Sequence, residues 1–374
     1  MDNANILMMM RLPEPPVTGG EIYYIKLRDY LKNHFASVEN ISWQMKPYKG
    51  PIRYLMESII MNFTLLRHLK GINSKTIILE EMDDSQDLFI FNAVTRAIRR
   101  LSGKQVYIVP VILHRESGLI KNKLLRSLKL LEESVFFNSS DGIVAISQFT
   151  CKSIKDTLWR EVEMVIAYPG LNVSGLDKKI TVRSQFQDLN LLFVGYITSR
   201  KGVDVLIQAL EILIKDKGME DVILHIVGNT EIDKKYFQKI QNYSQQAAID
   251  QHIIFHGWVS NRDIEELYFT ADIFVFPSFL EGFGMALAEA ASFGLPIITT
   301  DAGAIPFLIK DGINGILVPP GDAKRLALAI EHLAASPELR AKFGLANRKL
   351  AEEFQWERSF SKITEFLQKL ADRA

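Results

Sequence analysis

Residues 273–291 read IFVFPSFLEGFGMALAEAA, and this stretch decides the fold class. A short, wholly apolar run at 273–276 is typical of a buried strand, and the Pro-Ser pair after it ends the strand. Gly282 and Gly284 then allow a tight turn, and small apolar residues predict a helix that begins near Met285. A strand, a glycine turn and a helix in this order indicate a parallel α/β sheet whose helix N-terminus suits a phosphate group.

The same alternation extends along nearly the whole chain. We expect strands at residues 6–10, 38–43, 76–79, 106–113, 142–146, 164–167, 191–194, 222–227, 253–255, 273–276, 296–300 and 315–318. Helical periodicity occupies residues 21–35, 54–69, 88–101, 122–136, 203–215, 234–247, 263–269, 326–333 and 359–370. So many strands exceed one ordinary sheet, and a polar stretch at 172–189 interrupts the pattern. The predicted fold is therefore α/β, with two doubly wound domains at 1–172 and 191–355, a linker at 173–190 and a C-terminal helix within 356–374.

Composition excludes several classes of protein. The chain has 374 residues, 48% of them hydrophobic and 24% charged, and its formal net charge is zero. This balance argues against a nucleic-acid partner. One cysteine rules out an internal disulfide, and no apolar run approaches the ~20 residues of a membrane span, so we expect a cytoplasmic protein. The sequence has no phosphate-binding P-loop, no nucleophile elbow around Ser278 and no His/Cys cluster with metal-ligand spacing, so no metal is expected.

Two carboxylates bracket the glycine turn. Glu281 lies on the loop, where it can accept hydrogen bonds from hydroxyl groups. Glu289 lies in a helix of small apolar residues, where an ionised carboxylate is costly unless something hydrogen-bonds it, as a vicinal diol would. The alternative is that Glu289 points to solvent or caps a neighbouring strand.

Three further motifs follow expected strands. Arg200 and Lys201 precede the helix at 203–215 and can neutralise a diphosphate leaving group, although such a pair taken alone could be a solvated loop. Gly19 and Gly20 precede the helix at 21–35, where a Gly-Gly turn suits an anion or is simply a turn. His114 ends the strand at 106–113 and is expected to face a ligand cleft, with a structural histidine as the alternative.

Taken in order, these motifs resemble a known family. The resemblance is dense in the second half and rests there on residues 193–210 (FVGYITSRKGVDVLIQAL), 256–278 (HGWVSNRDIEELYFTADIFVFPS), 281–290 (EGFGMALAEA), 299–309 (TTDAGAIPFLI) and 311–330 (DGINGILVPPGDAKRLALAI). In the first half it rests on TGGEIYYIKLRDYL at 18–31 and VAISQFT at 144–150. The chain resembles a GT-B-fold, retaining glycosyltransferase of family 4, also called glycosyltransferases group 1.

This resemblance implies a fold and a set of site residues. In such enzymes two Rossmann-like domains face each other across a cleft, and the C-terminal helix returns to the first domain. The donor diphosphate would be held by Gly19, Gly20, Arg200 and Lys201. Glu281 would contact hydroxyls of the transferred sugar, and the backbone amides of Gly282, Phe283, Gly284 and Met285 would bind the sugar and phosphate. Glu289 would bind the ribose, the base would lie near Trp258 and Val259, and His114 would lie near the donor sugar.

The implied reaction transfers a sugar, with retention of configuration and without an obligatory metal or other cofactor. The donor would be a UDP- or GDP-linked sugar, and the acceptor a sugar, a lipid-linked or a small molecule in polysaccharide, glycolipid or glycoside synthesis. Two alternatives stay open, namely an inactive GT-B binding or scaffold subunit and another GT-B sugar-nucleotide enzyme. Basic residues at 96–129 suit peripheral contact with anionic lipid through the helix at 122–136, or equally a solvated helix face.

Overall fold

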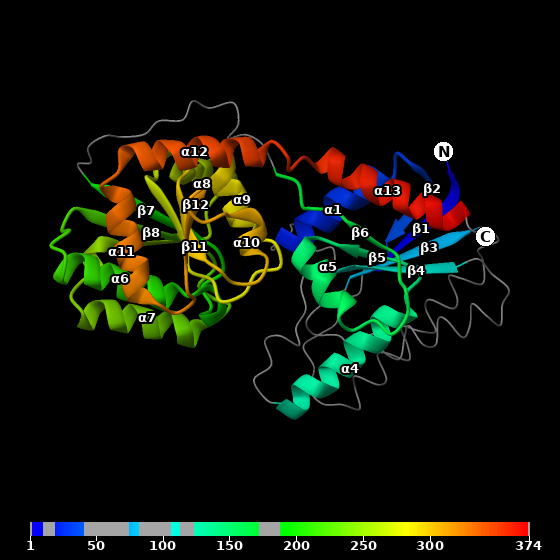
Figure 1. Ribbon diagram of the computed structural model, residues 1–374, viewed down its shortest axis with the longest axis horizontal. Coiled ribbons are helices and arrows are strands. Elements are labelled where there is room, and N and C mark those ends of the chain that lie inside the picture. The colour runs from blue at the N-terminus through cyan, green and yellow to red at the C-terminus, as the bar shows by residue number, and fades with distance from the viewer. Residues whose placement is uncertain are drawn as a thin grey trace. The chain divides into compact units, whose positions relative to one another are not determined.

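The computed structural model describes residues 2–9, 19–40, 75–81, 106–112, 123–171 and 188–372. The chain forms two compact units (Figure 1). Unit 1 comprises Met1–Pro169 together with Trp356–Ala374, and unit 2 comprises Gly170–Gln355. Each unit is built on its own parallel β-sheet, so the predicted α/β class is confirmed.

Unit 1 contains a six-stranded sheet in the order β2-β1-β3-β4-β5-β6, and every strand pair is parallel. Its strands are β1 (Asp2–Met9), β2 (Phe35–Asn40), β3 (Thr76–Glu81), β4 (Val106–Ile112), β5 (Ile143–Ala145) and β6 (Met164–Ile166). The helices in the described part of this unit are α1 (Gly19–Leu31), α4 (Lys123–Ser139), α5 (Gln148–Lys155) and α13 (Trp356–Asp372). The interior of the sheet is almost wholly apolar, as is typical of strands covered on both faces.

The last helix, α13, belongs to the core of unit 1. It lies beside α1, although the two helices are far apart in the sequence (Figure 1). Its apolar residues recur at helical spacing, and Ile363 and Leu367 have no exposed surface. Phe360 packs edge-on against Tyr23 of α1, with ring centroids 5.7 Å apart, and Lys75 donates a hydrogen bond to the carbonyl of Ala371 at 2.7 Å. This helix therefore completes unit 1 although it follows unit 2 in the chain.

Unit 2 contains a second six-stranded parallel sheet, in the order β12-β11-β10-β7-β8-β9. Its strands are β7 (Leu189–Val194), β8 (Val222–Val227), β9 (Ile253–Gly257), β10 (Ile273–Phe276), β11 (Ile297–Thr300) and β12 (Gly315–Val318). This order is that of a Rossmann fold, and the chain reverses its direction across the sheet between β7 and β10. Loops that follow these two strands meet at the switch point, where ligands of open α/β sheets bind.

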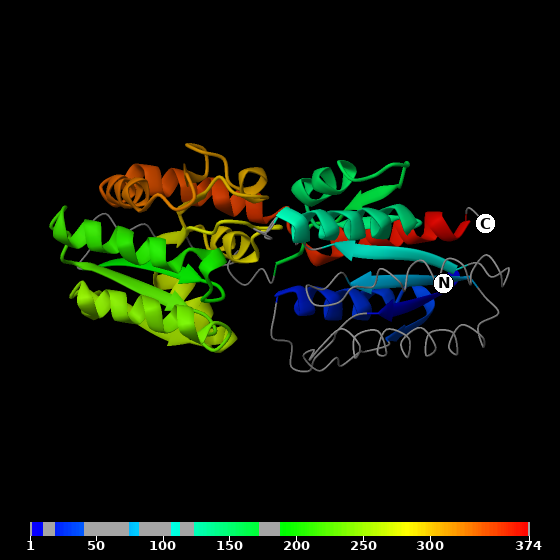
Figure 2. The same ribbon diagram turned by 90° about the horizontal axis from the view of Figure 1, so that it is seen from below.

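Helices lie on both sides of the strands of unit 2 (Figure 2). They are α6 (Val203–Lys215), α7 (Lys234–Gln246), α8 (Asn261–Thr270), α9 (Met285–Ser292), α10 (Ile305–Leu308), α11 (Ala323–Ala334) and α12 (Pro337–Ala351), with short 3₁₀ turns η3 (Ser199–Lys201) and η4 (Asp250–His252). Helix α6 shows why they form, because its residues at i, i+3, i+4 and i+7 from Val203 are buried. None of the helices in the described ranges is long and apolar enough to cross a membrane.

The structure corrects the expected linker. Residues 189–190 were placed in the linker, but they form the start of β7, which pairs with β8 from Leu189 onward. Asn190 is polar but belongs to the strand, and its amide oxygen lies 3.2 Å from the imidazole of His225 on the neighbouring strand. The expected helices at 54–69 and 88–101 lie outside the described residues.

Candidate active site

Two loops at the switch point of unit 2 are hydrogen-bonded to each other. The 3₁₀ turn η3 follows β7, and its Arg200 carbonyl accepts a hydrogen bond from the Phe279 N–H, 2.8 Å away on the loop after β10. Gly202 ends the turn with φ +69°, and a Cβ there would lie 2.2 Å from the carbonyl oxygen of Pro277. Only glycine combines this left-handed conformation with so close an approach. The backbone therefore fixes the distance between the two loops.

A buried ion cluster joins the same two loops. Glu281 and Lys201 are only 7% and 8% exposed, and their carboxylate and ammonium groups form a hydrogen-bonded ion pair through Oε1 of Glu281. The same oxygen accepts a hydrogen bond from Ser278 at 2.8 Å and lies 3.4 Å from the guanidinium of Arg200. Within the described residues, nothing is hydrogen-bonded to the second oxygen, Oε2. One side of the carboxylate is thus fully occupied by the protein and the other is not.

The electrostatics keep this carboxylate ionised. Burial on its own would raise the pKa of Glu281, but the positive charges of Lys201 and Arg200 hold it below its usual value. Burial lowers the pKa of Lys201, and the attraction of Glu281 opposes that shift. The ammonium group also lies 4.8 Å from the ring centroid of Phe276, a cation–π distance. Two cations and one anion leave the cluster with a surplus positive charge.

The loop then leads into helix α9. Gly284 precedes the helix with φ +93° and no side-chain hydrogen bond caps its first turn. Phe283 is 5% exposed and packs edge-on against Phe354, so it anchors the turn and its side chain faces the core. An uncapped helix N-terminus next to a cationic cluster is favourable for an anion.

Glu289 lies one turn inside α9, and a tyrosine holds it. The hydroxyl of Tyr268, on α8, donates a hydrogen bond to Oε2 of Glu289 at 2.9 Å. No other hydrogen bond to this carboxylate exists among the described residues, and Glu289 keeps part of its surface accessible. Burial raises the pKa of Glu289 to about 6, and the hydrogen bond from Tyr268 limits the rise.

The remaining predicted site residues are spread along the chain. Trp258 follows β9 with 65% of its surface exposed, and Val259 beside it is partly buried. Gly19 and Gly20 are the first two residues of α1 in unit 1. His114 lies outside the described residues. Within unit 2, the structure joins Arg200, Lys201 and Glu281 directly, and the chain itself links Glu281 to the start of α9.

Three partner residues were not predicted. Ser278 was considered only as a nucleophile, yet its hydroxyl donates to Glu281, and Thr300 in turn donates to the Ser278 carbonyl at 2.5 Å. Tyr268 was part of a helical pattern only. Sequence spacing does not reveal these roles, because Tyr268 and Thr300 come from other elements and the Ser278 contact depends on how its own loop folds.

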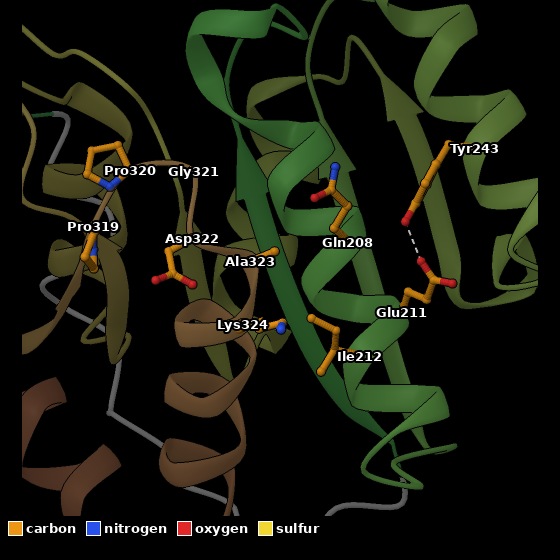
Figure 3. A pocket seen from close by; sticks show the side chains of 10 residues that line it. All are labelled: Gln208, Glu211, Ile212, Tyr243, Pro319, Pro320, Gly321, Asp322, Ala323 and Lys324. Carbon is orange, nitrogen blue, oxygen red and sulfur yellow. Dashed lines mark hydrogen bonds between the residues drawn. The ribbon is translucent and has the colours of Figure 1, made fainter.

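A separate pocket of about 620 Å³ lies on unit 2 between α6 and the start of α11. Figure 3 shows the residues that line it, which are Gln208, Glu211, Ile212, Tyr243, Pro319, Pro320, Gly321, Asp322, Ala323 and Lys324. Tyr243 and Glu211 are hydrogen-bonded to each other on one wall (Figure 3). None of the predicted site residues lines this pocket. In the described part of the chain, no group of three or more His, Cys, Asp or Glu side chains is arranged to hold a metal ion.

Comparison with known proteins supports the motif analysis. Residues 180–350 match the family model described as Glycosyl transferases group 1, and this region covers the whole switch-point site. Most of unit 2 is therefore similar to the group 1 glycosyltransferase domain. The predicted resemblance to glycosyltransferases group 1 is therefore confirmed over residues 180–350, on which the ion cluster and Glu289 lie.

Individual relatives agree with the family assignment. The chain is 29% identical over 167 residues to D-inositol 3-phosphate glycosyltransferase from Xylanimonas cellulosilytica. The aligned region covers 45% of this chain and 39% of that protein. Sucrose-phosphate synthase from Thermosynechococcus elongatus matches with a TM-score of 0.79 at 16% identity over all of both chains. Anabaena HepE in complex with UDP and glucose matches with a TM-score of 0.74 at 17% identity, over 97% of this chain and 98% of that one. The fold is GT-B, and the chain spans about half the length of the curated relatives it matches.

Proposed function

We propose that this chain is a retaining, metal-independent glycosyltransferase. It takes a sugar from a UDP- or GDP-linked donor and transfers it to a sugar, lipid-linked or small-molecule acceptor. The observation that supports this proposal best is the buried cluster of Arg200, Lys201 and Glu281 beside the uncapped start of α9. A diphosphate needs a cationic site with free N–H donors, and a glycosyl transfer needs that site to stabilise the leaving group.

The cluster suits a leaving diphosphate for an electrostatic reason. When the bond between sugar and phosphate breaks, negative charge grows on the phosphate oxygens. Arg200 offers a planar fork of donors and is 36% exposed at its side chain, so it can reach a ligand, whereas Lys201 acts as a fixed, buried charge. Because Glu281 already orients both cations, little reorganisation is needed as the charge develops.

The two carboxylates divide the remaining tasks. Oε2 of Glu281 has no protein partner among the described residues, which suits an acceptor for hydroxyls of the transferred sugar. Glu289, one helix turn further along, suits the hydroxyls of the ribose. The structural relative HepE is in complex with UDP and glucose. This favours a UDP-linked sugar as the donor of this chain as well.

Turnover assays test the proposal. The purified protein is incubated with UDP- and GDP-sugars, and nucleotide release and donor binding are measured. We expect release from at least one donor, weaker nucleotide binding in Glu289→Ala and slower turnover in Lys201→Ala. Binding without release under any acceptor condition would favour an inactive binding subunit, and wild-type kinetics in both variants would refute the assigned site.

We also propose peripheral contact with anionic membranes at the cytoplasmic face. Helix α4 supports it, because Lys123 and Arg126 are exposed, and Leu131 on the same helix is 60% exposed. Vesicle co-sedimentation is expected to increase with the fraction of anionic lipid. Equal sedimentation with neutral and anionic vesicles would contradict this part of the proposal.

A further inference from the structure

Tyr268 occupies an unusual position for a buried tyrosine. It is 2% exposed, and its ring is stacked on Phe293 at 5.2 Å and tilted against Phe274 at 5.9 Å. Its hydroxyl is not turned to solvent but donates to Oε2 of Glu289 at 2.9 Å. Aromatic packing from two elements thus fixes the ring, and the only polar atom of the side chain is hydrogen-bonded to a carboxylate.

The Glu289 carboxylate is held by this hydrogen bond alone among the described residues. Glu289 has three side-chain torsions, and within the described residues Tyr268 supplies the sole hydrogen bond to its oxygens. Arg348 of the neighbouring helix α12 donates to the carbonyl of Ser292, at the other end of α9. A carboxylate accepts about four hydrogen bonds, so Oε1 and the second lone pair of Oε2 stay available to a ligand.

We infer that Tyr268 is a positioning residue, which holds the Glu289 carboxylate in the orientation that accepts the two ribose hydroxyls of the donor. This inference rests on the proposed function. It names a residue that helps the site to distinguish a ribose from a sugar without its two hydroxyls. The hydroxyl of Tyr268 fixes one oxygen of Glu289 before the ligand arrives. The entropy cost of ordering this flexible side chain therefore does not weaken ligand binding. Tyr268 itself need not touch the donor.

The test compares UDP with its 2′,3′-dideoxy analogue, which lacks both ribose hydroxyls. Affinities are measured by calorimetry for the full-length wild type, Tyr268→Phe, Glu289→Ala and the control Tyr243→Phe. Tyr243 also donates its hydroxyl to a glutamate, Glu211, but on the wall of the separate pocket (Figure 3). Phenylalanine keeps the aromatic stack on Phe293, so Tyr268→Phe is expected to fold, which the thermal unfolding midpoint checks.

The ratio of the two affinities separates positioning from a general structural role. In wild type and Tyr243→Phe we expect UDP to bind at least about tenfold more tightly than the analogue, because two hydrogen bonds to a charged group are lost. In Tyr268→Phe this ratio is expected to fall by about threefold or more, mostly through weaker UDP binding, and in Glu289→Ala it is expected to approach one.

Each other outcome overturns a distinct statement. An unchanged ratio in Tyr268→Phe, whether the two affinities fall equally or not at all, overturns the positioning role while the proposed function stands. A wild type that binds neither UDP nor GDP overturns the proposed function itself. In the Glu289→Ala background, Tyr268→Phe is expected to have no further effect on the ratio, and an additional loss there would also contradict the inference.

Discussion

At the scale of single residues, both glutamates of the site share one arrangement. In each, one carboxylate oxygen is bound by the protein and the other has no partner among the described residues. Their charges are nevertheless maintained differently. Glu281 is held ionised by two cations, whereas burial pushes the pKa of Glu289 up to about 6. Glu289 is therefore a destabilising residue at neutral pH, which is typical of a group kept for binding.

The first prediction concerns stability and pH at Glu289. Its pKa rises from 4.5 to about 6 on folding, so the folded state holds the proton more strongly and loses stability as pH rises through this range. Glu289→Gln removes that loss. We expect the unfolding free energy of the variant relative to wild type to grow by about 1 kcal/mol between pH 5 and pH 8.

Differential scanning calorimetry measures this effect. The Tm difference between Glu289→Gln and wild type is expected to be about 2–4 °C larger at pH 8 than at pH 5. The exposed Glu220→Gln serves as the control and should show no such trend. A constant difference across the pH range would mean that Glu289 is not desolvated in the folded protein.

The residues of the ion cluster and Glu289 could be singled out from the sequence because the motifs that carry them are local. A cation pair after one strand and a glutamate on each side of a glycine turn after another are visible as motifs, and parallel topology brings such loops together. Tyr268, Ser278 and Thr300 could not be predicted in the same way. The roles of Tyr268 and Thr300 depend on which atom of a distant element lies within hydrogen-bond distance, and the role of Ser278 depends on how its own loop folds.

At the scale of elements, buried strands were the easiest feature to predict. The strands at 222–227, 273–276 and 315–318 have the predicted bounds, because short apolar runs between turn residues leave little choice. Helix α12 was missed. Its residues Arg340 and Asn347 are buried and polar, so the apolar periodicity is weak, and their hydrogen bonds to carbonyls of other segments stabilise it.

A pair of glycine variants tests how the two site loops are held together. Gly202 and Gly218 both have left-handed φ, at +69° and +65°, but a Cβ at Gly218 would meet nothing within 4 Å. Gly218→Ala therefore reports conformational strain alone, about 1 kcal/mol. Gly202→Ala must also move the Pro277 carbonyl, so we expect it to cost at least about 2 kcal/mol more and to weaken UDP binding.

Urea unfolding and calorimetric titration with UDP measure both effects. Equal stability losses in the two variants, with UDP binding intact in Gly202→Ala, would show that the close approach of these loops is not needed.

At the scale of the whole molecule, the chain builds two independent sheets and uses its last helix to finish the first one. Charge and composition could exclude classes of partner, but they could not reveal that the last helix completes unit 1. The amphipathic pattern of residues 359–370 did indicate a helix with one buried face. The structure gives that face its partner, because α13 packs on α1 and on strands of unit 1.

Disrupting α13 should therefore affect the two units unequally. Leu367 is fully buried, and Leu367→Asp places an unpaired charge in the core of unit 1, at a cost of several kcal/mol. Hydrogen–deuterium exchange is expected to accelerate in β1, β3, β5 and β6 and to stay unchanged in β7–β12. The exposed Lys362→Asp is the control. Faster exchange in both sheets alike would contradict the division into units.

The central claim is that the η3 turn and the start of α9 form one nucleotide diphosphate site. Hydrogen–deuterium exchange with and without saturating UDP tests it most directly. We predict slower exchange at residues 199–203 and 281–289 in wild type, and no such slowing in Lys201→Ala at the same UDP concentration. Unchanged exchange at both segments, or slowing confined to residues 319–324 at the separate pocket, would contradict it.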